Sequence, residues 1–149
     1  MTINKTLFLF VGGILFSACT TKTEITETPQ QKEERRAKEI AAPFIANEIG
    51  DFNILVEKVK DTSLDNWQRS LYADKLCKAF VQYMCPAVNS IYSPAKNVKE
   101  RGTVKVVLSD DFNQRADLQR EFIRKKWTEY GKQQAYKESL LDIENAKNK

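Results

Sequence analysis

The stretch "DTSLDNWQRSLYADKLCKAFVQYMCP", residues 61–86, decides the fold class of this chain. Its large apolar residues recur at helical spacing, so they fall on one side of an α-helix. Ser63 is a suitable N-cap, and Pro86 ends the segment because proline cannot donate a backbone N–H. The apolar residues of this stripe are Leu64, Trp67, Leu71, Leu76, Phe80 and Tyr83.

A second helix is predicted upstream, starting near residue 35. We expect Pro43 to open or kink this helix and Gly50 to weaken its middle. Branched side chains in 52–59 also allow a strand after a turn at Gly50 and Asp51, but we favour the helix. Its apolar stripe consists of Ile40, Phe44 or Ile45, Ile49, Phe52, Val56 and Val59.

Residues 86–102 are rich in proline, asparagine and glycine, which predicts a long connection. The next segment, "TVKVVL" at 103–108, is the best strand candidate because it is β-branched and is bounded by Gly102 and Ser109. A single strand needs a partner strand, and 52–59 is the only other strand candidate in the sequence.

The last helix is predicted from about residue 110 to residue 145. Ser109, Asp110 and Asp111 suit the positive end of a helix dipole, and we expect Gly131 to interrupt the helix. The apolar positions before Gly131 are Phe112, Ala116, Phe122 or Ile123, Trp127 and Tyr130. Those after it are Tyr136, Leu140, Leu141 and Ile143.

These patterns predict a mainly α fold: one domain over 35–149, built as a small bundle of three or four helices with a minor β-element at 103–108. Before it lies "TTKTEITETPQQKEE", residues 20–34, in which Ile25 is the one large apolar residue. Such a segment cannot bury enough apolar surface to become ordered, so 19–34 is predicted to be a flexible tether.

The first eighteen residues have the composition of a signal peptide. Lys5 provides positive charge, "LFLFVGGILF" (7–16) is apolar, and "SAC" (17–19) is the small-residue end. Even about fifteen apolar residues would reach only about 22 Å as a helix, less than the ~30 Å thickness of the hydrocarbon core of a membrane. We therefore predict that 1–18 is a cleaved signal peptide.

The combination of Phe16 with Ser17, Ala18 and Cys19 resembles the lipobox of bacterial lipoproteins, a resemblance that covers residues 1–20 alone. It implies cleavage after Ala18, a diacylglyceryl group on the sulfur of Cys19 and acylation, typically with palmitate, of the new amino group. Phe16 departs from the usual leucine, and the alternative is an ordinary signal peptide. Thr20, which is not aspartate, resembles the sorting pattern for the outer membrane, facing the periplasm.

Composition limits the function classes. The formal net charge is a mild +4, and a periplasmic location excludes nucleic acid as a partner. Histidine is absent, which excludes histidine-based triads and the commonest zinc ligand. No cofactor, metal site or catalytic residue is predicted, since acidic pairs such as Glu48 with Asp51 are no signal among many acidic residues.

Cys77 and Cys85 are predicted to form a disulfide, because paired thiols in an oxidising compartment are usually bonded. On one continuous helix their α-carbons would be about 12 Å apart, whereas a disulfide needs less than about 7 Å. Either the helix ends near Val81 and the chain folds back at Cys85, or the two thiols are buried separately.

One basic segment is a candidate contact surface. Lys96, Lys99, Arg101 and Lys105 could meet anionic lipid headgroups, an acidic partner or the carboxylates of peptidoglycan. The alternative is a solvated loop.

The sequence thus favours a lipoprotein bound to the bilayer through Cys19, acting as a non-catalytic interaction module at the cell envelope. Its expected partner is an envelope protein, in a role of the inhibitor, immunity, exclusion or envelope-assembly type. One alternative is a structural lipoprotein joined to the cell wall through Lys149. Such proteins are continuous coiled coils, and Gly131, the aromatic residues and the connection at 86–102 break that pattern. The other is a small carboxylate-based enzyme acting on peptidoglycan.

Overall fold

The computed structural model describes residues 27–93 and 103–148. The signal peptide at 1–18, the cleavage position Ala18 and the lipidation position Cys19 lie outside the described residues. The described part is mainly helical, as predicted, and contains a two-stranded antiparallel hairpin. In chain order the elements are α1 (Pro29–Lys60), α2 (Asn66–Ala79), α3 (Val81–Met84), β1 (Val88–Ser93), β2 (Thr103–Leu108) and α4 (Phe112–Lys147).

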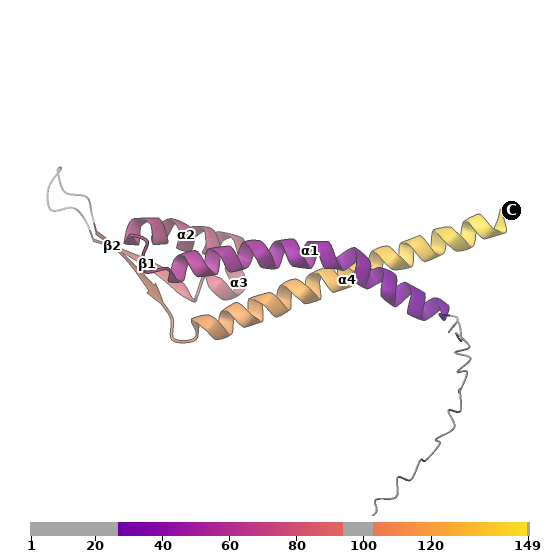
Figure 1. Cartoon of the computed structure of the whole chain (residues 1–149), viewed down its shortest axis with the longest axis horizontal. Coiled ribbons are helices and arrows are strands. Elements are labelled where there is room, and N and C mark those ends of the chain that lie inside the picture. The colour runs from indigo at the N-terminus through magenta and orange to yellow at the C-terminus, as the bar shows by residue number, and fades with distance from the viewer. Residues whose placement is uncertain (1–26, 94–102, 149) are drawn as a thin grey trace, which may run out of the picture.

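The two long helices α1 and α4 run alongside each other and cross, and α2, α3 and the hairpin pack at one end of this pair (Figure 1). At the other end, the start of α1 and the last third of α4 diverge (Figure 1). The core lies where all the elements meet, and every element contributes to it. Its largest fully buried side chains are Phe52, Leu76, Met84 and Ile123.

The start of α1 corrects the predicted boundary at residue 35. The helix begins at Pro29, because Thr28 accepts a hydrogen bond from the N–H of Gln31 while the Gln31 side chain accepts one from the N–H of Thr28. Residues 29–34, predicted to belong to the tether, are therefore helical.

The rest of α1 confirms the helix predicted for 52–59 and excludes the strand. Pro43 does not open the helix but lies inside it, and α1 bends about midway along its length (Figure 1).

The N-cap of α2 is Asp65 and not Ser63, which corrects another expectation. The Asp65 carboxylate accepts a hydrogen bond of 2.8 Å from the N–H of Gln68, and the Gln68 side chain caps the N–H of Asp65 in return. Ser63 instead donates both its N–H and its hydroxyl to Asp61.

The strand predicted at 103–108 is confirmed, but its expected partner is wrong. β2 pairs with β1, which lies inside the segment predicted as a connection, and Val88 is opposite Leu108. Buried and exposed residues alternate along the strand β2, as expected for a hairpin with one covered face. Val88, Val104 and Val106 are buried on the face that packs on α2.

The predicted interruption at Gly131 is also wrong, since α4 runs through it. Gly131 is buried against Ala37 and Ala41 of α1. A glycine that weakens the helix locally is thus explained by a close crossing of two helices.

Candidate functional site

Cys77 and Cys85 form a disulfide, with their α-carbons 4.1 Å apart. Of the two alternatives, the structure shows the helix that ends near Val81. α2 stops at Ala79, and Phe80 takes a non-helical conformation (φ −130°, ψ 55°) before the short α3. The turn brings Cys85 back onto the end of α2. The disulfide therefore fixes the return of the chain toward β1.

Of the four residues of the predicted basic surface, the structure describes one. Lys105 is exposed on β2, opposite Ile91, whereas Lys96, Lys99 and Arg101 lie outside the described residues.

Two of the acidic residues considered from the sequence have structural partners. Glu48 accepts hydrogen bonds from the Trp127 indole and the Lys126 ammonium, which ties α1 to α4. Asp111 accepts hydrogen bonds from the Ser109 hydroxyl and the Arg115 guanidinium, and the first of these is the main reason why its pKa lies below the usual value.

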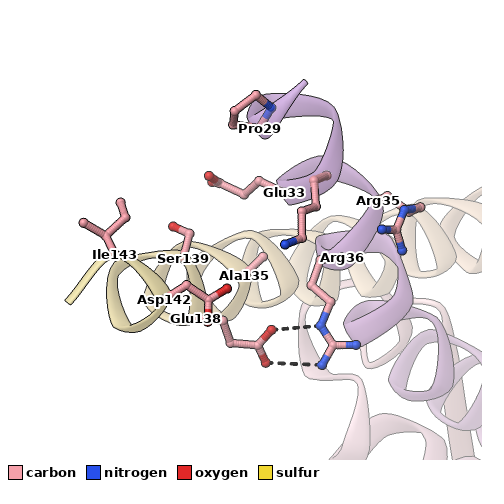
Figure 2. A pocket seen from close by; sticks show the side chains of 10 residues that line it. Pro29, Glu33, Arg35, Arg36, Ala135, Glu138, Ser139, Asp142 and Ile143 are labelled. Atoms are coloured by element: carbon pink, nitrogen blue, oxygen red, sulfur yellow. Dashed lines mark hydrogen bonds and ion pairs between the residues drawn. The ribbon is translucent and has the colours of Figure 1, made fainter. Parts of the chain in front are cut away.

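A groove opens where α1 and α4 diverge, and we call it the α1–α4 groove (Figure 2). It has a volume of about 340 Å³ and brings together the two ends of the described chain, which sequence reasoning did not single out. Its lining residues are Pro29, Lys32, Glu33, Arg35, Arg36, Ala135, Glu138, Ser139, Asp142 and Ile143.

The charged groups of the groove largely neutralise one another. Arg36 and Glu138 face each other across it, joined by hydrogen bonds of 2.8 and 3.4 Å (Figure 2). This contact with Glu138 raises the pKa of Arg36, and Arg35 with Arg36 lowers that of Glu39. Both partners of the Arg36–Glu138 pair are about half exposed, so the pair adds little to stability and leaves the groove accessible.

Beside the groove, α4 carries an exposed line of side chains that we call the α4 stripe: Lys132, Tyr136, Leu140, Ile143 and Lys147. Their spacing of three or four residues keeps them on one side of the helix. Tyr136, Leu140 and Ile143 are 55%, 47% and 53% exposed, and the neighbouring Leu141 is also exposed. The sequence identified these apolar residues as helical but not as a surface.

The described residues contain no cluster of three or more side chains able to hold a metal ion. Within 27–93 and 103–148, no helix is long and apolar enough to cross a membrane. No family model matches the chain, and comparison with curated proteins and with solved structures gives no match. Function is therefore argued from the residues themselves.

Proposed function

We propose that this protein is a membrane-anchored bacterial lipoprotein that acts as a non-catalytic interaction module at the cell envelope, at the outer membrane and facing the periplasm. The lipobox-like sequence that ends at Cys19 supports the anchor. The Cys77–Cys85 disulfide is consistent with an oxidising compartment.

The observation that carries the interaction role is the exposed apolar surface of α4 beside the α1–α4 groove. Four large apolar side chains are exposed within the last third of one helix, namely Tyr136, Leu140, Leu141 and Ile143. Apolar residues scattered singly need no explanation, but a cluster of this kind beside a groove is typical of a contact surface. The envelope-protein partner expected from the sequence would contact this end of α4 at Leu141, which lies outside the α4 stripe.

The anchor is tested by the intact mass of the protein purified from bacterial membranes. We expect a mass that corresponds to cleavage after Ala18 and acylation of Cys19, and a gain of two hydrogens when Cys77–Cys85 is reduced. Cys19→Ser should give an unprocessed precursor without palmitate. An unmodified mass, or normal processing of the variant, would contradict the anchor.

The interaction role is tested by a photo-crosslinking residue at Leu141, with a matched residue at Leu71 on α2. Both positions are exposed leucines on helices. In cells, Leu141 should form a discrete crosslinked species that Leu71 does not form. Equal crosslinking at both positions, or none, would contradict a contact surface on α4.

A structural lipoprotein that links the outer membrane to the cell wall is a second candidate. The uninterrupted course of α4 through Gly131 favours it, because it removes one of the three arguments against it; the aromatic residues and the segment 86–102 still depart from a continuous coiled coil. Mass spectrometry of digested cell walls tests this candidate. A muropeptide attached to Lys149 would support it, and a free Lys149 in wall-depleted protein would exclude it.

A further inference from the structure

We infer that the α4 stripe lies on the surface of the lipid bilayer to which Cys19 is attached, so the protein meets the membrane at two places. This inference rests on the proposed lipid anchor. It adds a second contact, made by the folded part of the chain, and it determines which end of the protein faces the membrane.

The chemistry of the α4 stripe suits a bilayer surface. Leu140 and Ile143 provide apolar contact in the middle, and Tyr136 has an apolar ring with a hydroxyl that can stay in water. Lys147 closes one end of the stripe, and Lys132, whose ammonium group is paired with Glu129 at 2.9 Å, closes the other. Both long side chains can bury their methylene groups while the ammonium groups reach lipid phosphates. This is the arrangement of an interfacial helix, with an apolar centre and basic ends.

Acidic residues lie near the stripe, and two of them are paired with basic side chains. Of the three acidic residues that follow Lys132 on α4, Glu138 and Asp142 line the α1–α4 groove and Glu144 lies beside the stripe. Glu138 is paired with Arg36. Glu129, which precedes the stripe, is paired with Lys132 at 2.9 Å. The five residues of the stripe are themselves basic or apolar, and the carboxylates of Glu129 and Glu144 lie beside them.

The anchor would join the protein at the same end. Pro29, the first residue of α1, and Ile143 of the stripe line the same groove (Figure 2). Residues 20–28 separate the anchor from α1 and can span at most about 30 Å. The acylated Cys19 therefore holds the stripe close to the bilayer, which raises the effective concentration of a weakly binding surface.

The charges of the stripe disfavour a second copy of the chain as the occupant. In an antiparallel pair centred on Leu140, Lys132 of one copy would face Lys147 of the other. In a parallel pair each lysine would face its own counterpart. Both arrangements place like charges opposite each other, whereas lipid phosphates complement the lysines.

The test uses the full acylated chain in vesicles of phosphatidylethanolamine and phosphatidylglycerol, with an environment-sensitive fluorophore on Leu140→Cys. The matched control is Leu118→Cys, an exposed leucine near the opposite end of the same helix. We expect the emission to shift to the blue and intensify at position 140 and to stay unchanged at position 118. No difference between the two positions would overturn the inference, even where the mass shows acylation and the anchor stands.

Two further arms separate the remaining outcomes. A blue shift at position 140 that appears without vesicles and disappears on dilution would indicate a second copy and overturn the inference. A Cys19→Ser chain that begins at position 19, and so lacks the apolar segment 7–16, is tested by sedimentation with the same vesicles, so the result does not depend on the anchor. There Leu140→Asp should weaken binding by about tenfold, since it removes one partly buried leucine. Equal binding of this variant and its parent, or no binding by either, would overturn the inference.

Discussion

Gly131 of α4 lies directly against the backbone of Ala37 in α1, so a β-carbon at position 131 would overlap with the carbonyl oxygen of Ala37. The same β-carbon would lie 3.1 Å from the β-carbon of Ala41. The small side chains of Ala37, Ala41 and Ala135 are all buried along this crossing. Glycine is thus required here because there is no space for a side chain. Its φ is not in the left-handed region, so the backbone conformation does not require glycine.

Gly131→Ala is therefore expected to destabilise the protein although alanine is the better helix former. The new methyl group must push the backbones of α1 and α4 apart, and overpacking of this kind costs about 1–3 kcal/mol. Urea denaturation followed by circular dichroism measures the change in the free energy of unfolding.

Gly50→Ala is the matched control, because Gly50 also lies inside a long helix but has open space around its missing side chain. There the helix propensity of alanine should act alone and stabilise by about 0.5–1 kcal/mol. Two changes of the same sign would contradict the close crossing.

Removing the disulfide should destabilise the protein by the same amount whichever of the two cysteines is replaced. The bond closes a short loop of chain between Cys77 and Cys85, for which chain entropy gives about 2–3 kcal/mol. Cys77→Ser and Cys85→Ser are compared by thermal unfolding with the oxidised parent, which keeps the disulfide. Clearly unequal effects would indicate that the two thiols contribute separately.

Periodicity was enough to predict which segments are helical, but not where the helices begin or which of their apolar residues are buried, since Trp67 and Leu71 are exposed. Phe52, Leu76 and Ile123 recur in register with their neighbours because a helix buries one side, and each is fully buried. β1 escaped prediction because Pro86 and Pro94 flank it and Asn89 lies within it, so the segment resembled a loop. Its identity as a strand comes from pairing with β2, which no local pattern contains.

The α1–α4 groove could not be predicted from the sequence for a similar reason. It is built by Pro29 and Arg36 from one end of the chain and Glu138 and Ile143 from the other. Nothing near Gly131 in the sequence indicates that a helix nearly a hundred residues earlier approaches it closely. One signal was present, since the apolar positions of α4 outnumber those that one partner helix can cover.

The two leucines of α2 should respond very differently to truncation. Leu76 is fully buried and Leu71 is 50% exposed. Leu76→Ala leaves a cavity in the core and is expected to cost about 2–5 kcal/mol. Leu71→Ala should change the free energy of unfolding by about 0.5 kcal/mol or less. Chemical denaturation measures both, and a large effect of Leu71→Ala would mean that this face of α2 is covered in solution.

Ser109→Ala is expected to weaken the protein at neutral pH but not in acid. The Ser109 hydroxyl donates a hydrogen bond of 2.6 Å to Asp111 and is the first cause of the lowered pKa of that carboxyl group, ahead of Arg115. A carboxyl whose native pKa is lowered stabilises the fold above its unfolded pKa. This contribution is lost as the pH falls through the native pKa.

The pKa of Asp111 in the variant should therefore rise toward its usual value, as followed by the carboxyl carbon in an NMR titration. The stability difference between the variant and its parent should be largest at neutral pH and vanish once Asp111 is protonated in both. Ser139→Ala is the control, because the Ser139 hydroxyl donates its hydrogen bond to the backbone carbonyl of Tyr136 and not to a carboxylate. A stability difference for Ser109→Ala that is as independent of pH as that of the control would show that the hydroxyl does not act through Asp111.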